Sequence, residues 1–464
     1  MNRQVFLLSV AIAFLMFVVP YASALTDITN CTDLQNIANN LTENYQLVNN
    51  IDCSDTTNWN SGDGFVPIQN FNGVFDGQGY NISDLVINRP TETQMGLFGL
   101  SNVYMEIRNV GILNGNVSGT SSGGLASDIE SGFVNNSFYE GVVYCTEGNC
   151  GGLVGYTGEA DINNSHAVVT IIGVKVSGAN YIGGLIGFNG KNIYNSYAIA
   201  TITGDLGYDI GGLVGRHFSS GSIYNSHAIV TIDSGTEYTS GFVGWNSGGS
   251  IYNSYVIGTI NGTTWVSGFV GDNGDGLIVN SYSISNVTGN DKVAGFVADN
   301  HGTSNITNSF SNSNVIGTSN VGGFASQSYD GATCTNSYWN TDNGVLTSAC
   351  ATGKTTEELM TETTFENWDF ATIWHYQTNC LPALFGQPFL YCFAPEEIIV
   401  PSTDKGLIYD IMNSAGAGIG LFFIYLAGSL PLLIIGILIA VMVVVIGSSF
   451  IGIFRGGETK SLNS

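Results

Sequence analysis

The feature that most constrains this chain is a phrase of about 28 residues that recurs along most of its length. Its clearest copy is IGGLIGFNGKNIYNSYAIATI, from Ile182 to Ile202. An Asn-Ser pair recurs in each copy, and successive pairs are separated by 28, 31, 30, 28, 27, 28 and 28 residues. A fixed period of this size indicates a repeat architecture, in which each copy is one unit stacked on the next. The recurring asparagines are Asn136, Asn164, Asn195, Asn225, Asn253, Asn280, Asn308 and Asn336.

Alternation after each Asn-Ser pair predicts strands, because apolar residues recur at every second position, as at Ala198, Ala200 and Ile202. A single rung cannot bury its apolar face, so neighbouring rungs must stack. The predicted fold is all-β: a single-stranded parallel β-helix (β-solenoid) of about nine rungs of ~28 residues, with capped ends. We expect the eight asparagines to form a structural ladder whose amides bond from rung to rung at about 4.8 Å.

Composition limits the partners. The chain has 464 residues, and 11 Lys and Arg stand against 36 Asp and Glu, for a net charge of −25. This balance argues against nucleic acid, whose phosphates need basic clusters, and against anionic membrane surfaces or anionic glycans. We expect no cofactor and no metal.

Eight cysteines, an even number with no CxxC pair, favour disulfides in an oxidising compartment over zinc or a redox site. Eight cysteines allow 105 pairings. Proximity in the sequence favours four local bridges: Cys31–Cys53, Cys145–Cys150, Cys334–Cys350 and Cys380–Cys392.

Several phrases in the sequence together carry a family resemblance. GVFDGQGYNISDLVIN, the following MGLFG, and the repeated GGLVG and NSY or NSH phrases together resemble the GLUG-motif family of secreted and surface proteins. The resemblance covers roughly residues 28–390 and implies an extracellular parallel β-helix, often tied to adhesion or carried as a module in larger surface proteins. Some immunoglobulin-degrading metallopeptidases carry the same repeat beside a zinc protease domain. This sequence has no HExxH motif, so that activity does not carry over.

The chain divides into successive segments. Residues 1–24 are predicted to be a signal peptide, with an apolar run before Ala22-Ser23-Ala24. Residues 25–92 would form an N-terminal cap and the first rungs, 93–340 the GLUG-type solenoid, and 341–392 a C-terminal cap. Within that cap we expect a short helix over 354–361 and three aromatic residues, Trp368, Phe370 and Trp374, packed over the last rung.

The C-terminal part predicts a membrane anchor. A stalk at 393–414 precedes 415–454, where no charge occurs and about 20 apolar residues would suffice for a transmembrane helix. One kinked span is the economical interpretation, and a hairpin of two short spans is the alternative. Arg455 and Lys460 place the tail, 455–464, inside. The protein would then be a single-pass type I membrane protein of a cell or virion surface.

The sequence contains two histidines and an Asp-rich stretch that could suggest metal sites, and several sequons that could be glycosylated. His166 and His227 replace the tyrosines of other rungs and lie two rungs apart, about 9.6 Å, too far to share a metal. Residues 272–276 lack the distal Glu of a calcium loop and indicate a turn. N-glycosylation is predicted at seven sequons in turn-like stretches: Asn30, Asn40, Asn81, Asn116, Asn261, Asn286 and Asn305.

The sequence predicts no catalysis. The FDGQG phrase at 75–79 also occurs in β-helical polysaccharide hydrolases, which need two or three converging carboxylates. Asp76 has no acidic neighbour at the same position of adjacent rungs, and Asp205 and Asp209 share one loop. We therefore expect a protein that is not an enzyme.

The expected function is adhesion or recognition by a membrane-anchored extracellular solenoid, with an extracellular protein or glycan as ligand. The longest inter-rung loops, 174–180, 204–208 and 235–239, are the expected contact points. A homo-oligomer is compatible with such a rod. Two alternatives stay open: an envelope spike or coat glycoprotein of a virus or an archaeal-type cell surface, and a carbohydrate-active β-helix enzyme.

Overall fold

The computed structural model describes residues 25–174, 180–204, 207–218, 221–387 and 392. The chain forms two compact units, one up to Thr378 and one from Asn379. The predicted signal peptide, stalk, transmembrane segment and inner tail lie outside the described residues. None of the helices within the described ranges combines the length and the hydropathy needed to span a bilayer.

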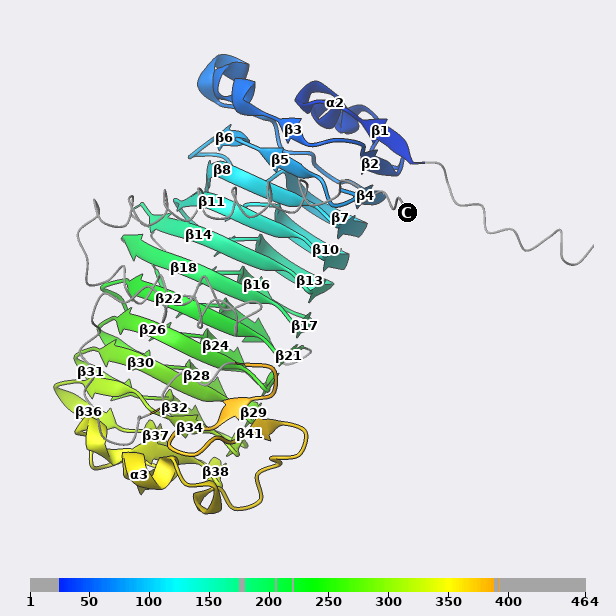
Figure 1. Ribbon diagram of the computed structural model, residues 1–464. Coiled ribbons are helices and arrows are strands. Elements are labelled where there is room, and N and C mark those ends of the chain that lie inside the picture. The colour runs from blue at the N-terminus through cyan, green and yellow to red at the C-terminus, as the bar shows by residue number, and fades with distance from the viewer. Residues whose placement is uncertain (1–24, 175–179, 205–206, 219–220, 388–391, 393–464) are drawn as a thin grey trace, which may run out of the picture. The chain divides into compact units, whose positions relative to one another are not determined.

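The first unit is a parallel β-solenoid of about ten turns, which confirms the predicted fold class. Three parallel sheets run along it, and successive rungs stack strand on strand (Figure 1). One turn passes through sheet C at β15 (Ile182–Gly183), through sheet A at β16 (Ile186–Asn189) and β17 (Ile193–Tyr194), and through sheet B at β18 (Tyr197–Gly204).

Sheet A contains eighteen strands: β1 (Thr26–Ile28), β2 (Tyr45–Leu47), β4 (Val74–Asp76), β7 (Phe98–Arg108), β10 (Ala126–Asn135), β13 (Val154–Asn163), β16, β17, β20 (Val214–Phe218), β21 (Ser222–Tyr224), β24 (Val243–Ser247), β25 (Ser250–Tyr252), β28 (Val270–Gly274), β29 (Leu277–Val279), β32 (Val297–His301), β33 (Asn305–Thr307), β37 (Ala325–Ser328) and β38 (Thr333–Thr335).

Sheet B contains fourteen strands: β3 (Ile51–Asp52), β5 (Asn81–Ser83), β6 (Val86–Asn88), β8 (Gly111–Gly119), β11 (Phe138–Cys145), β14 (His166–Gly173), β18, β22 (His227–Asp233), β26 (Tyr255–Asn261), β30 (Tyr282–Thr288), β34 (Phe310–Ser311), β35 (Asn314–Ile316), β39 (Tyr338–Asn340) and β40 (Thr352–Lys354).

Sheet C contains eight short strands: β9 (Ser122–Gly123), β12 (Cys150–Gly151), β15, β19 (Ile210–Gly211), β23 (Thr239–Ser240), β27 (Thr264–Ser267), β31 (Asp291–Ala294) and β36 (Ser319–Gly322). Two further short strands are β41 (Trp374–His375) and β42 (Ala383–Leu384).

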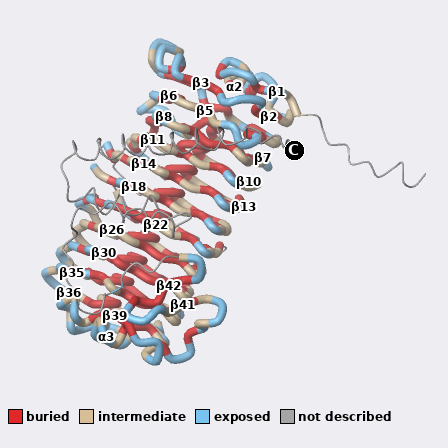
Figure 2. Tube along the Cα trace, viewed as in Figure 1, coloured by how far each residue is buried: buried red, intermediate tan, exposed pale blue. Residues whose placement is uncertain are grey.

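The core is a set of in-register columns. Ala198 pairs with Ala228, and Ile202 with Ile232, and all four side chains are buried (Figure 2). A Phe column fills the later rungs, where ring centroids of Phe242 and its neighbour lie 4.6 Å apart. Glycine is required where rungs crowd: a Cβ at Gly184 would lie 2.1 Å from the carbonyl oxygen of the next rung.

The predicted asparagine ladder runs along one corner. Asn195 and Asn225 both have φ of +49°, the left-handed conformation that Asn tolerates better than most residues. The Asn195 Nδ2 donates to Asn164 Oδ1 at 3.2 Å, and Asn225 Nδ2 to Asn195 Oδ1 at 3.2 Å. The neighbouring serines form a second ladder, in which the Ser196 amide donates to Ser226 Oγ at 3.2 Å.

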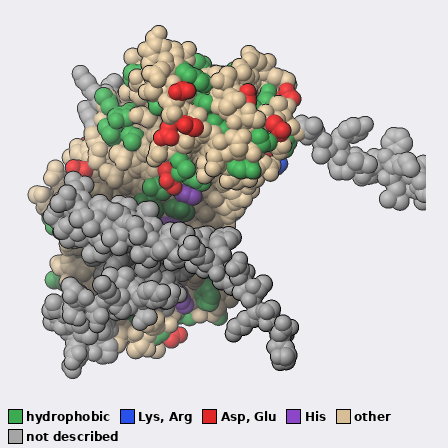
Figure 3. Space-filling view, turned by 45° about the horizontal axis from the view of Figure 1, so that its top comes forward, with side chains coloured by type: hydrophobic (Ala, Val, Ile, Leu, Met, Phe, Trp, Pro, Cys, Tyr) green, Lys and Arg blue, Asp and Glu red, His purple; other side chains and the backbone are tan. Residues whose placement is uncertain are grey.

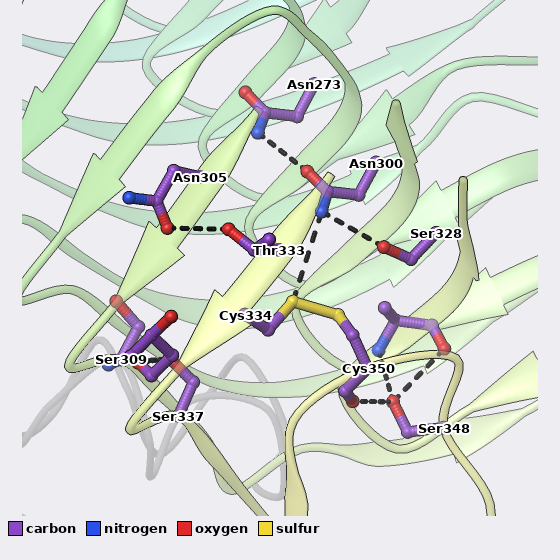
Figure 4. The surroundings of a disulfide bond; sticks show 12 residues. Asn273, Asn300, Asn305, Ser309, Ser328, Thr333, Cys334, Ser337, Ser348 and Cys350 are labelled. Atoms are coloured by element: carbon purple, nitrogen blue, oxygen red, sulfur yellow. Dashed lines mark hydrogen bonds between the residues drawn. A yellow bond between two sulfur atoms is a disulfide. The ribbon is translucent and has the colours of Figure 1, made fainter. Parts of the chain in front are cut away.

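A third polar ladder lies entirely inside the solenoid. Asn246 Nδ2 donates to Asn273 Oδ1 at 2.8 Å, and Asn273 Nδ2 donates to Asn300 Oδ1 at 2.9 Å. The ladder ends beside the disulfide of Cys334, which the Asn300 amide approaches (Figure 4). Because these amides are fully buried, each needs the partner on the next rung to offset its desolvation.

One histidine interrupts this internal ladder. His217 is fully buried, and its Nδ1 lies 2.9 Å from the Asn189 Nδ2 donor. Burial is the main cause that lowers the pKa of His217 to about 4. The ring is therefore neutral at pH 7.

Both ends of the first unit carry short helices. The N-terminal end has α2 (Cys31–Asn36), capped by Asn30, and the short 3₁₀ helices Ile37–Asn39 and Ser54–Gly62. The C-terminal end has 3₁₀ helices Thr341–Asn343 and Glu362–Thr364 around α3 (Thr356–Leu359), which lies inside the predicted 354–361. Trp374 packs against Tyr282 and Phe310 and covers the aromatic residues of the last rungs.

The cysteines form the four bridges that proximity favoured: Cys31–Cys53, Cys145–Cys150, Cys334–Cys350 and Cys380–Cys392. The first three link neighbouring parts of the solenoid, and the last lies in the unit from Asn379.

Substituting Asn225 tests the outer ladder. Asn225→Ala loses the bonds to the adjacent rungs and places alanine, which tolerates the left-handed region less well than asparagine, at φ of +49°, so we expect a loss of about 2 kcal/mol in the free energy of unfolding. Asn225→Gly keeps the backbone conformation and should lose less. Thermal unfolding of the full chain measures both, and equal losses for the two variants would contradict a conformational role for this column.

Substituting His217 tests the inner ladder. The folded pKa lies below the ordinary 6.5, so the unfolded state binds the proton first and stability falls as pH falls from 6.5 towards 4. The effect should reach ~3 kcal/mol. His217→Asn would continue the amide ladder and remove this part of the acid sensitivity. Unfolding curves at several pH values measure it, and an unchanged pH slope in His217→Asn would refute the assignment.

Candidate functional site

The described residues bring charged and aromatic side chains together where sheet C turns into sheet A. We call this the corner cluster. It consists of two adjacent columns, one on each side of the corner. The first is at the start of the sheet C strands, with Asp209 and Tyr238 directly before β19 and β23 and Trp265 and Lys292 inside β27 and β31. The second is on sheet A: Arg216, Trp245, Asp272 and Asp299.

The backbone of the sheet C column is unusual. Asp209, Tyr238, Trp265 and Lys292 have φ of +51°, +51°, +52° and +52°. Asparagine fills the corresponding positions of the outer ladder, whereas here bulky side chains occupy the left-handed region at a cost of order 1 kcal/mol each. The stacked rungs hold this conformation, since each residue lies between the paired strands of its neighbours.

Arg216 is the centre of the first half of the cluster. Its Nη1 donates to the Tyr181 hydroxyl at 2.9 Å and lies 3.9 Å from Asp209 Oδ2. The guanidinium also covers the Trp245 ring, with Cζ 3.8 Å from the ring centroid. Arg216 thus joins three rungs through a hydrogen bond, an ion pair and a cation–π contact.

Asp299 is the centre of the second half. Its Oδ2 accepts from Trp265 Nε1 at 3.4 Å and from the Tyr329 hydroxyl at 3.3 Å, and lies 3.9 Å from Lys292 Nζ. The Lys292 ammonium lies over the Trp265 ring, 4.2 Å from its centroid, and Tyr238 stacks on the same Trp at 4.5 Å.

Asp272 links the two halves. It pairs in register with Asp299 on the next rung, so the two Cα atoms are about 4.8 Å apart. His301 Nε2 lies 2.9 Å from Asp272 Oδ1. Burial raises the pKa of Asp272 to about 6 and that of Asp209 to about 7, and the negative charge of Asp272 adds to the shift at Asp209.

Two polar atoms of the cluster have no hydrogen-bond partner among the described residues. They are Oδ1 of Asp299, a residue only 4% exposed, and Nε of Arg216. Buried polar atoms are nearly always satisfied, so an acceptor and a donor without partners beside half-buried aromatic rings mark this corner as a candidate binding site. The two atoms lie three rungs apart, about 14 Å along the solenoid, so different groups of a ligand would have to reach them.

Two acidic residues that the sequence offered as candidates for catalysis or calcium binding, Asp76 and Asp275, lie outside the corner cluster and make structural contacts. Asp76 forms an ion pair with Arg108, with Nε and Oδ2 2.7 Å apart. Burial alone would raise its pKa, but hydrogen bonds from Gln78, Arg108 and Asn109 outweigh burial and lower the pKa. Asp275 accepts from the Thr303 amide of the next rung at 2.8 Å, and its φ of +58° is the left-handed conformation of a turn residue. Among the described residues no group of His, Cys, Asp and Glu could hold a metal ion.

The histidine column is an aromatic stack on the outside of sheet B. His166 lies 4.5 Å from the Tyr197 ring, and His227 lies 4.9 Å from Tyr197 and 4.8 Å from Tyr255. Burial lowers the pKa of His227 to about 4. As expected, His166 and His227 lie two rungs apart, with Tyr197 between them.

The seven predicted glycosylation sites all lie at exposed or half-buried positions, and their modification stays a prediction. Asn30 is also the N-cap of α2, and its amide Nδ2 donates to Asp33. The other sites are Asn40, Asn81, Asn116, Asn261, Asn286 and Asn305.

The sequence analysis missed the corner cluster. Asp209 was considered only beside Asp205, which lies outside the described residues, and was not connected with Asp272 or Asp299. A signal was present, because Asp272 and Asp299 occupy the same place in FVGDN and FVADN, 27 residues apart. The other members differ in type from rung to rung, so periodicity does not reveal them.

Comparison with known proteins finds the GLUG motif at residues 178–203. Halomucin from Haloquadratum walsbyi is 35% identical over 175 residues, which cover 36% of this chain and 2% of halomucin. This chain thus spans a small fraction of that relative.

Two solved structures are also similar. A protein described as an immunoglobulin A1 protease from Bacteroides ovatus has 20% identity and a TM-score of 0.33, covering 78% of this chain and 93% of its own. An IgA1 protease has 16% identity and a TM-score of 0.36, covering 84% of this chain and 27% of its own. With TM-scores this low, neither carries an argument. The motif at 178–203, which spans β15 to β17 and all of β18 except Gly204, and the match to halomucin support the resemblance: this chain carries a GLUG motif at residues 178–203.

Proposed function

We propose that this protein is a cell-surface solenoid that recognises neutral glycans through the corner cluster. The observation that carries the proposal is the pair of open atoms, Asp299 Oδ1 and Arg216 Nε, in a cluster rimmed by Trp245, Trp265 and Tyr238. One hydroxyl of an oligosaccharide can donate to the carboxylate, and a second hydroxyl, three rungs away along the solenoid, can accept from the guanidinium, while pyranose C–H groups pack on aromatic side chains. The net charge of −25 favours a neutral glycan over an anionic one.

The location of the cluster supports recognition. Of the expected contact loops, 204–208 comes directly before Asp209 in the sequence, and 235–239 contains Tyr238. Long loops beside a rigid scaffold are where binding residues concentrate. The rigid left-handed backbone of the column also holds the side chains in place before a ligand arrives, which lowers the entropic cost of binding.

A surface location has separate support. All eight cysteines are in disulfides, which persist in oxidising, extracytoplasmic environments. The β-solenoid fold and the match to halomucin are in keeping with a cell-surface protein. A membrane anchor at 415–454 completes the proposal, and an envelope or coat protein of a particle would use the same anchor.

A carbohydrate-active enzyme is the second candidate, because of one observation. Asp272 and Asp299 lie on adjacent rungs, and Asp209 has a pKa of about 7, the range that suits a general acid. In this case the same corner would cleave the glycan that it binds.

Calorimetric titration of the full chain with neutral oligosaccharides tests the proposal. Asp299→Asn keeps the shape of the side chain but replaces the open acceptor by an amide, and we expect at least a tenfold loss of affinity, about 1.4 kcal/mol. Trp245→Ala should have a similar effect, and both variants should unfold near the wild-type temperature.

Asp76→Asn is the matched control, because Asp76 is, like Asp299, a buried carboxylate paired with a basic side chain, but it lies outside the corner. It should bind like the wild type. Absence of saturable binding to any neutral glycan, or equal affinity in Asp299→Asn, would rule the proposal out. Release of shorter oligosaccharides that stops in Asp272→Asn would support the enzyme instead.

A further inference from the structure

The corner cluster is part of a longer strip that runs along the solenoid. On sheet A its column continues towards the N-terminus through Phe188 and Tyr156, which lie in register with Arg216. Beside them Tyr181 continues the sheet C column, because it lies directly before β15. We call the strip from the rung of Tyr156 to the rung of Asp299 the corner track. It covers six rungs, or about 24 Å.

Each of the last four rungs of the corner track has a polar atom without a hydrogen-bond partner among the described residues. The four atoms are Arg216 Nε, Trp245 Nε1, Asp272 Oδ2 and Asp299 Oδ1. Their residues are in register in the sheet A column, on neighbouring rungs that are about 4.8 Å apart. A ligand that contacts the whole set must therefore lie along the solenoid axis.

The four atoms have an order that limits the chemistry of the ligand. The first two are N–H donors and the last two are carboxylate acceptors. An anionic chain would place negative charge beside Asp272 and Asp299, and a cationic chain would place positive charge beside Arg216. A neutral chain of hydroxyl-bearing units can accept from the donors and donate to the carboxylates. The surroundings also disfavour an anionic chain, because acidic side chains are scattered over a mainly uncharged surface (Figure 3).

The separation of the outermost atoms limits the length of the ligand. Arg216 and Asp299 are three rungs apart, about 14 Å. One pyranose unit lengthens an extended chain by a distance close to one rung spacing, so a single sugar or a disaccharide cannot reach both ends. A chain of about four units can reach them.

The register between rungs limits the shape of the ligand. Strands β20, β24, β28 and β32 lie side by side, paired in parallel without a shift (Figure 1). The four polar residues therefore follow a line along the stack. An extended chain can follow this line, whereas a coiled chain turns away from it and keeps fewer of the contacts.

The first two rungs of the corner track are apolar. Phe188 and Tyr156 stack with ring centroids 5.0 Å apart, and the Tyr181 ring lies 5.7 Å from Phe188. All three residues are half-buried, so part of each side chain is open to a ligand. Sugar units beyond the fourth would pack here through their C–H groups.

We infer that the corner track binds a linear neutral glycan of roughly four or more units, extended along the solenoid axis. This inference rests on the proposed function, because it takes the corner as a glycan site. It adds the length, the shape and the direction of the ligand. Arg216 and Asp299 hold the two ends of the four-unit segment, and Phe188 contacts further units.

Calorimetric titration of the full chain with two series of neutral probes tests the inference. The extended series consists of β-1,4-linked oligosaccharides of glucose, mannose or xylose, from two to six units long. The coiled series consists of α-1,4-linked glucose oligosaccharides of the same lengths. Affinity in the extended series should rise roughly tenfold between three and four units, because the fourth unit adds the contact at the second end. The coiled series should show no such step.

Three variants locate the contacts. Asp299→Asn replaces the acceptor at one end by an amide and should remove the step between three and four units. Phe188→Ala should keep that step and lose the smaller gain from four to six units. Asp76→Asn, outside the corner, should show the wild-type dependence on length. Thermal unfolding of each variant checks its fold, and the length series of the wild-type chain tests the inference even where a variant does not fold.

Several outcomes would overturn the inference and leave glycan recognition in place. These are equal affinities for two and six units, a step that persists in Asp299→Asn, and equal binding of the extended and the coiled series. If none of the β-1,4-linked probes binds, the inference is also wrong, and saturable binding of a different neutral glycan would then still support the proposed function.

Discussion

Exact register between parallel rungs is the constraint on which the rest of this structure depends. Each residue lies directly above its counterpart on the previous turn, at about 4.8 Å, so every position becomes a column along the solenoid. A column is stable when its members can contact like neighbours: alanine on alanine, phenylalanine on phenylalanine, amide on amide. Some columns exclude certain residue types. At Gly184, for example, the carbonyl oxygen of the next rung leaves no space for a side chain.

Three polar ladders show how this constraint treats groups that are costly to bury. The outer asparagines, the serines beside them and the internal amides each give every donor an acceptor one rung away. In an ordinary globular core such groups would need separate partners. Here one substitution affects two neighbouring bonds. His217 is an example: its Nδ1 lies beside Asn189 Nδ2, but its Nε2 and the Oδ1 of Asn246 on the next rung have no hydrogen-bond partner among the described residues, so the amide chain is interrupted there.

The corner cluster and the strands of sheet B show two opposite results of the same geometry. On sheet B the columns are uniform, and each side chain stacks on a similar side chain of the next rung. At the corner the columns are mixed, with Asp, Tyr, Trp, Lys and Arg in succession, and mixed columns create a single place with its own chemistry. There, charges are balanced by neighbours on different rungs, and two polar atoms stay open.

The sequence by itself determined the repeat, the strand alternation, the asparagine column and the local pairing of the cysteines, because each of these depends on residues that recur at one period or lie close along the chain. Only the tertiary structure decided which columns adjoin. Asp209 and Asp272 are 63 residues apart and differ in their place within the repeat, yet the corner brings them within electrostatic reach. The register also showed that Asn189 and Asn246, unremarkable in the sequence, belong to a buried ladder. A period fixes what lies above and below a residue, whereas the path of the chain around each turn fixes what lies beside it.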